Sequence, residues 1–256
     1  MAKSKTEVAA VPGEETKALA AIPADLVQHA GQGTQNLGKE DARPPRLMIC
    51  QSGSPQRKPD DPKEIEGLRE LDLFNDLTGE IYGRGPLRFV VVLCLGARHI
   101  EFNPMEDGGG VKDYDVKPGD PRTQFTTDQA SGERVKPVAT KFYDYVVWLP
   151  DYSDVVALSM KSTQLKVAMR LNGLLMSALK IPGAGVVPNP PSWARTFELG
   201  TAMEKDAQYS WGNFTLKSVG ITEEETRSIC AGLAQQWSQK NIIIERDQEE
   251  AENSGM

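Results

Sequence analysis

Short apolar runs separated by glycine, proline and polar turns dominate the chain from Arg43 onward. The strongest run, residues 86–95, is dense in β-branched side chains and has the length of a strand. Asn75-Asp76 and Gly79 are the residue types that a hairpin turn requires between residues 73 and 83. The pattern predicts that hairpin and strands at residues 46–51, 86–95, 98–102, 142–149, 154–160, 195–199 and 209–219.

Two segments have helical spacing instead. In residues 162–179, with Ser162 or Thr163 as the N-cap, one face carries Leu165, Ala168, Met169, Leu175, Met176 and Leu179. Lys166 and Arg170 lie on the opposite face. Residues 222–225 form a capping box that predicts a second helix to about Gln239. Because strands outnumber helices without regular alternation, we expect a mainly β (β-rich α+β) barrel or sandwich with added helices.

Composition divides the chain into three parts. Residues 1–41 are rich in Ala, Gly, Gln and charge with little periodicity, which predicts a flexible N-terminal arm with one short helix at 24–30. Residues 42–244 are expected to form a single β-rich domain, and residues 245–256 a flexible acidic tail. Residues 106–133 contain three consecutive glycines and read as a long functional or mobile loop.

The net charge of −7 is distributed unevenly. Residues 1–41 hold four lysines and six acids (−2), and residues 245–256 hold one arginine and five acids (−4). About −1 is left for residues 42–244. The central domain is therefore nearly neutral and has room for a basic surface.

The sequence shows neither a targeting signal nor a metal-binding spacing of cysteines. No run reaches the roughly 18 apolar residues of a membrane helix, and no secretory signal is evident, so we expect cytoplasmic residence. Cys50, Cys94 and Cys230 are widely spaced without a C-x-x-C pair. They are expected to be buried thiols, neither a disulfide framework nor a zinc site.

The sequence contains no set of residues that predicts a catalytic site. Residues 33–39 match the spacing of a phosphate-binding loop, but Glu40 stands where Ser or Thr must hold magnesium. His29 and His99 are the only histidines, and neither lies in a nucleophile motif. Asp113, Asp115 and Asp120 lack the spacing of a calcium loop and read as solvated acids. We expect no enzyme, no cofactor and no metal.

Aromatic residues interleaved with cations are the remaining chemical signal. Rings can stack on unpaired bases while Lys and Arg contact phosphates, which is what a single-strand binder needs. Strand alternation places Tyr143 and Tyr145 on one face of the densest segment, and we expect that face to be outward. The candidate nucleic-acid-binding residues are Arg88, Arg98, Phe102, Lys141, Tyr143, Tyr145, Lys161, Lys166, Arg170, Trp211 and Lys217.

Three motifs resemble a family. Residues 43–47 (RPPRL), 74–83 (FNDLTGEIYG) and 159–168 (SMKSTQLKVA) are similar to tailed-bacteriophage single-stranded DNA-binding proteins, over residues 43–180. The resemblance implies an OB-like barrel, which would carry the predicted internal and C-terminal helices, and residence in the host cytoplasm if the chain is phage-encoded. It also implies single-stranded DNA binding in phage replication or recombination, with the acidic tail recruiting replication or recombination proteins. Members of this family that have an acidic C-terminal tail often end in an aromatic residue, and this sequence does not.

Other functions remain open. The β-rich pattern and long Gly/Pro loops also suit a phage structural or assembly protein, or an adaptor or inhibitor that binds a host protein. The acidic tail could alternatively compete with nucleic acid for a basic groove. The sequence leaves DNA against RNA, and monomer against homo-oligomer, undecided.

Overall fold

The computed structural model describes Gln32 and residues 44–104, 106 and 108–238. The chain divides into two units, residues 1–38 and 39–256, and the fold below is that of the second unit. The short helix predicted at 24–30 and the tail predicted at 245–256 lie outside the described residues, as does the predicted arm apart from Gln32.

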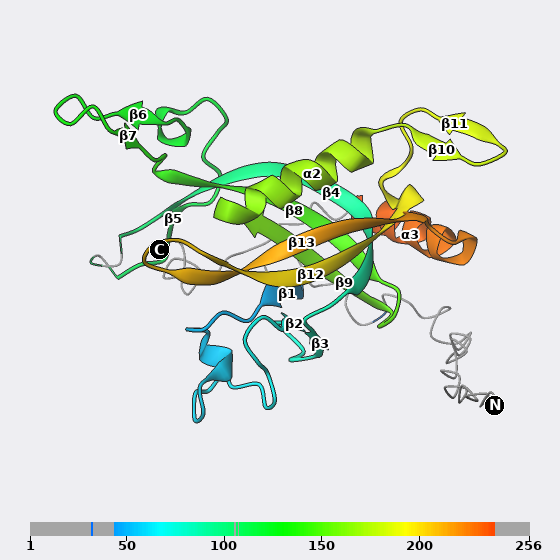
Figure 1. Cartoon of the computed structure of the whole chain (residues 1–256), viewed down its shortest axis with the longest axis horizontal. Helices are drawn as coiled ribbons and strands as arrows, with labels where there is room; N and C mark the ends of the chain where they lie inside the picture. The colour runs from blue at the N-terminus through cyan, green and yellow to red at the C-terminus, as the bar shows by residue number, and fades with distance from the viewer. Residues whose placement is uncertain (1–31, 33–43, 105, 107, 239–256) are drawn as a thin grey trace, which may run out of the picture. The chain divides into compact units, whose positions relative to one another are not determined.

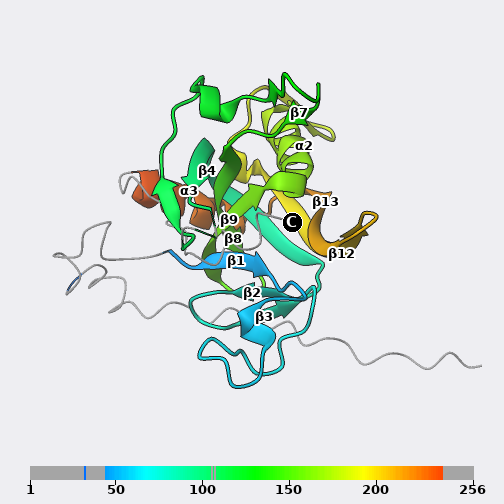
Figure 2. The same ribbon diagram turned by 90° about the vertical axis from the view of Figure 1, so that its left-hand side faces the viewer.

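One strongly curled sheet, shaped as a half-barrel, dominates the structure (Figures 1 and 2). Its neighbours run β13-β12-β4-β8-β9-β1-β2-β3, and β5 pairs with β4. Its strands are β1 (Arg46–Ile49), β2 (Leu73–Asn75), β3 (Ile81–Gly83), β4 (Leu87–Phe102), β5 (Val111–Asp113), β8 (Ala139–Leu149), β9 (Asp154–Lys161), β12 (Arg195–Lys205) and β13 (Ser210–Ile221). Two small hairpins lie outside it: β6 (Thr126–Thr127) with β7 (Arg134–Val135), and β10 (Leu179–Ile181) with β11 (Gly185–Val187).

The connectivity is OB-like. The meander β4-β8-β9 is followed by helix α2 (Leu165–Met176), and the hairpin β12-β13 returns to the free edge of β4. Three strands, a helix and two strands in a curled sheet are the arrangement of an OB-type barrel. The predicted mainly β, OB-like class is confirmed. Strand β1 adds to the far edge, pairing in parallel with β9, and leads into β2 and β3.

Strand β4 is longer than its sequence suggests. The expected interruption at Gly96 is wrong, because β4 continues through it for 16 residues. Its pairing with β8 shifts register between Val91 and Leu93 and between Cys94 and Gly96. Such bulges bend a strand without ending it, and Gly96 has the positive φ (+89°) that only glycine adopts easily.

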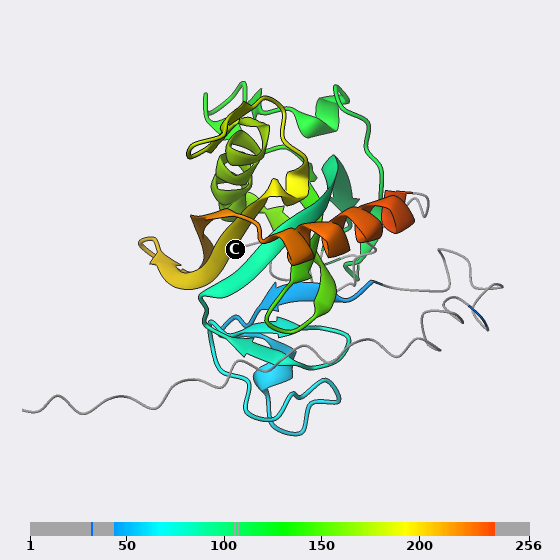
Figure 3. The same ribbon diagram turned by 90° about the vertical axis from the view of Figure 1, so that its right-hand side faces the viewer.

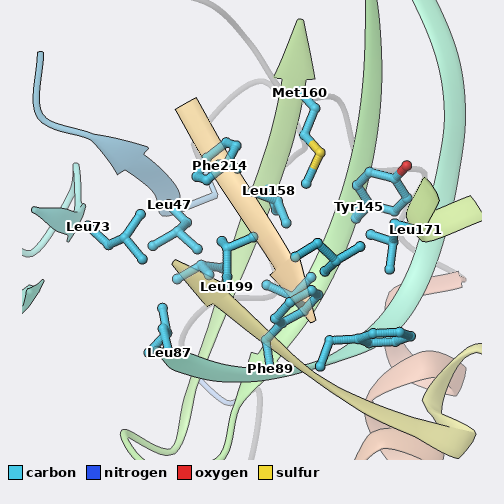
Figure 4. Packing of buried hydrophobic residues seen from close by; sticks show 14 of the residues in the cluster. Leu47, Leu73, Leu87, Phe89, Tyr145, Leu158, Met160, Leu171, Leu199 and Phe214 are labelled. Carbon is cyan, nitrogen blue, oxygen red and sulfur yellow. The ribbon is translucent and has the colours of Figure 1, made fainter. Parts of the chain in front are cut away.

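Two helices cover opposite faces of the sheet. The inner face carries the main core, including Phe89, Tyr145 and Leu199, against Leu171 of α2 (Figure 4). The outer face carries Val90 and Val146 beneath α3 (Glu224–Ser238), which crosses β4 (Figure 3). Alternate residues of the central strands are therefore buried on both sides.

Helix α2 differs from its prediction at both ends. Ser162 begins a short 3₁₀ turn with φ +51°, and the Gln164 N-cap makes no side-chain capping bond, so the predicted Ser162 or Thr163 cap is wrong. The helix ends at Met176, because residues 179–181 pair as β10. Met169 and Met176 are exposed, not on the core face as expected.

A side chain closes the curl where no strand does. The amide of Gln51 follows β1 and donates through Nε2 to the Gly212 carbonyl (3.0 Å). It also accepts through Oε1 from the Gly212 N–H (2.7 Å). Glycine is needed because a Cβ at position 212 would lie 2.7 Å from Leu71 Cδ2 and 3.0 Å from Ile49 Cγ2. Gln51 thus joins β13 to the β1–β2 end of the sheet.

We predict that Gln51→Ala lowers the free energy of unfolding by about 1–3 kcal/mol, because it leaves the buried Gly212 N–H and C=O unpaired. Urea denaturation measures the loss, and hydrogen exchange at the Gly212 amide should accelerate. Gln56→Ala, in the loop after β1, is the control and should unfold as the wild type does. Equal stability of the two variants would contradict the closing role.

The three cysteines provide a second test. Cys50 and Cys230 are buried as expected, whereas Cys94 is exposed. Burial raises the pKa of the Cys50 thiol to about 11 and that of Cys230 to about 12. Near pH 8 both stay protonated and unreactive. A disulfide reagent should label one thiol in the folded protein and three after unfolding. Cys94→Ser should abolish the labelling of the folded protein. Rapid labelling of all three thiols in the folded protein would contradict the burial of Cys50 and Cys230.

Candidate nucleic-acid interface

A long stretch of the chain is basic without any acid. Residues 155–197 contain no Asp or Glu and five cations, namely Lys161, Lys166, Arg170, Lys180 and Arg195. The stretch runs from β9 through α2 and the β10–β11 hairpin to the start of β12. In a protein of net charge −7, this concentrates positive charge on and around α2.

Three of these cations are exposed. Lys166 and Arg170 lie on the solvent side of α2, and Lys180 lies on β10 just after the helix. In the part of the chain that the structure describes, none of the three forms an ion pair. The exposed methionines Met169 and Met176, the latter 80% exposed, lie on the same helix. This surface offers unneutralised charge beside apolar side chains.

Arg195 holds this surface in place. Its Nη2 donates to the carbonyl oxygens of Ser177 and Ala178, each at 2.9 Å. These carbonyls follow the last turn of α2, where main-chain acceptors lack helical partners and a cation is favourable. Arg195 therefore stabilises the end of α2. Sequence reasoning missed Lys180 and Arg195, although the absence of acids from residues 155–197 would have revealed them.

Tyr143 and Lys141 form a cation–π pair on the inner face. The Lys141 ammonium lies 4.8 Å from the centroid of the Tyr143 ring, and both side chains are half-buried. His99 is the cross-strand neighbour of Lys141. Burial, followed by the charge of Lys141, lowers the pKa of His99 and keeps it neutral near pH 7. Of the two tyrosines on β8, Tyr143 and Tyr145, only Tyr143 is partly exposed to solvent.

Tyr145 is not outward, and its prediction as a binding residue is wrong. Its side chain is 1% exposed and lies beside Leu171 of α2 (Figure 4). Its hydroxyl donates to Asn172 Oδ1 at 2.9 Å. Helix α2 covers this part of the inner face, which strand alternation alone could not reveal. Tyr145 therefore joins the helix to the sheet.

A second group of predicted residues lies on the outer face. Arg98 and Lys161 flank the buried Phe142 across neighbouring strands. Arg98 forms an ion pair with Asp144 at 3.1 Å, and the Lys161 ammonium lies 5.8 Å from the Phe142 ring. The half-exposed ring of Phe102 lies 6.3 Å from that of Phe142. These contacts hold Arg98, Lys161 and Phe102 against the outer face of the sheet. Lys141 and Tyr143 lie on the inner face, so the structure does not bring the two sets of residues together.

A third group lies at the other end of the outer face. Arg88 and Lys217 flank Glu198 across β4, β12 and β13. Arg88 pairs with Asp151 and Lys217 pairs with Glu198 (3.1 Å), so both charges are compensated. Trp211 is half-buried, and its indole N–H has no hydrogen-bond partner among the described residues.

An open hollow of about 320 Å³ adjoins this third group. Its lining residues are Arg84, Gly85, Pro86, Glu198, Gly200, Thr201, Thr215, Leu216 and Lys217. No group of three His, Cys, Asp or Glu able to hold a metal occurs within the described ranges. In the same ranges, no helix is long and apolar enough to cross a membrane.

The long connection between β4 and β8 contains ordered elements and a cluster of charges at its base. Arg122 pairs with Glu101 (2.5 Å), Asp113 (3.1 Å) and Asp120 (2.8 Å). The Arg122 guanidinium lowers the pKa of Asp120 to about 2. Asp113 and Asp120 are therefore ion-paired, which the sequence analysis did not foresee, while their side chains stay partly exposed to solvent. Glu101 belongs to β4, so the cluster fixes the connection to the sheet.

One protein-family model matches this chain. The model of the Pam3 phage gp34-like protein family matches residues 14–240, which is most of the chain. Searches of curated proteins and of solved structures give no match. The phage part of the sequence resemblance is confirmed, whereas single-stranded DNA binding stays a prediction. The chain belongs to the Pam3 phage gp34-like protein family.

Proposed function

We propose that the protein is a non-enzymatic, sequence-tolerant binder of single-stranded DNA in phage replication or recombination. The observation that carries this proposal is the acid-free stretch of residues 155–197, with Lys166, Arg170 and Lys180 exposed. Unneutralised cations on one surface attract the phosphate backbone independently of sequence. The OB-like arrangement supports the proposal, because such barrels commonly bind oligonucleotides.

Lys141 and Tyr143 add the second requirement of the proposal. A single-strand binder needs rings for unpaired bases as well as cations for phosphates. Tyr143 precedes Tyr145, which contacts α2 directly, so its ring lies on the same face of β8 as the basic helix. Lys141 orients the ring and adds positive charge beside it. Bases would therefore stack at Tyr143 while phosphates follow α2.

The structure guides the choice of measurement. Trp148, Trp193 and Trp237 pack in the cluster beneath α3, on the outer face, so tryptophan fluorescence would report poorly on α2. Fluorescence anisotropy of a labelled oligothymidine of about 20 nucleotides avoids this difficulty. It should be measured between about 50 and 200 mM salt, where phosphate contacts are most evident.

We predict that the wild type binds this oligonucleotide and that affinity falls steeply with salt. The double variant Lys166→Ala/Arg170→Ala should bind more weakly, with the slope of log K against log salt reduced by about 1.4, since each lost single-strand phosphate contact removes about 0.7. Lys58→Ala/Lys205→Ala changes the net charge equally, outside residues 155–197, and should retain the wild-type slope.

Two results would reject the proposal. No binding by the wild type at about 50 mM salt would exclude single-stranded DNA as the ligand. An equal loss of slope in the control variant would mean that net charge, not the α2 surface, governs binding. An oligouridine of the same length, titrated in parallel, decides between DNA and RNA.

A further inference from the structure

An exposed phenylalanine and an arginine form a stacked pair on the connection between β4 and β8. Phe125 precedes β6 and is 53% exposed. The guanidinium carbon of Arg134, on β7, lies 3.7 Å from the centroid of the Phe125 ring. Arginine covers one face of an aromatic ring in such a contact. The other face of the Phe125 ring has no aromatic partner among the described residues.

The β6–β7 hairpin holds this pair on a defined support. The Arg122 cluster with Glu101, Asp113 and Asp120 joins the start of the hairpin to β4 and β5. At the hairpin turn, Asp128 Oδ1 accepts the N–H groups of Ala130 (2.7 Å) and Ser131 (3.0 Å). Asp128 is thus used to build the turn, while Arg134 brings positive charge to the ring.

The hairpin is continuous with the surface proposed to bind DNA. Val135 ends β7 only six residues before Lys141, so the two lie within roughly 20 Å even if the chain is fully extended. Figures 1 and 2 draw the hairpin and α2 on the same, upper side of the curled sheet. A strand that follows α2 and reaches Tyr143 could continue to Phe125.

We propose that Phe125 and Arg134 form a second contact point for the same strand. An unpaired nucleobase stacks on the ring face opposite Arg134, while the guanidinium contacts an adjacent phosphate. The chemistry favours a nucleotide over an apolar protein surface, because the cation that covers the ring would be buried unpaired against an apolar partner. This inference rests on the proposed function and extends it by a site that sequence reasoning left unassigned.

The test compares Phe125→Ala with Thr127→Ala, a control on β6 at the position opposite Arg134. Anisotropy titrations use oligothymidine and an abasic strand of equal length. Loss of one stacked base should weaken oligothymidine binding about tenfold, or about 1.4 kcal/mol, for Phe125→Ala. The salt slope should not change, since no phosphate contact is lost. Thr127→Ala should bind as the wild type does, and Phe125→Trp should retain binding.

The outcomes separate this inference from the proposed function. If the wild type and Phe125→Ala bind oligothymidine equally, the hairpin site is rejected while the α2 surface stands. If Phe125→Ala weakens binding to the abasic strand as much as to oligothymidine, the ring acts through the fold of the hairpin and stacking is rejected. If the wild type binds neither strand, both proposals fail.

Discussion

The structure depends on one strand that must pair on both edges while bending. Strand β4 joins β12 through residues 87–90 and β8 through residues 90–101, so it belongs to two differently oriented parts of the sheet. A regular strand of 16 residues could not serve both. The register shifts around Val92 and Leu95 provide the bend. Without them the sheet would not curl around α2, and the inner core would remain open.

The curl determines which aromatic residues can meet a ligand. Because α2 covers the inner face and α3 covers the outer face, rings at the centre of β8 are buried whichever way they point. On the inner face Tyr145 packs beneath α2; on the outer face Trp148 packs in the cluster beneath α3, and Phe142 is buried beside Phe102. Exposed rings, such as Phe125 just before β6, lie at the periphery, and Tyr143 near the start of β8 is half-buried. A binding surface on this fold must therefore lie around the sheet ends and not across its middle.

Charge is separated in the same way. Cations that lie on the sheet are mostly compensated, as Arg88 is by Asp151 and Arg98 is by Asp144. Those on α2 and β10 lie in a stretch that contains no acid. The overall negative charge therefore conceals a basic surface, and its location, more than the sum of charges, decides what the protein can attract. Arg195 connects the two features by holding the end of the helix that carries the charge.

The sequence by itself determined most strands of the curled sheet, the presence of the two helices and their order, because periodicity and turn residues such as Gly79 are local properties. It also contained the acid-free segment of residues 155–197. Only the tertiary structure decided that Tyr145 is buried, that Arg98 and Lys161 lie apart from Lys141 and Tyr143, and that Gln51 closes the curl onto Gly212. Alternation tells which residues share a face, but which face a helix covers, and which acid meets which cation, depends on contacts between segments far apart in the chain.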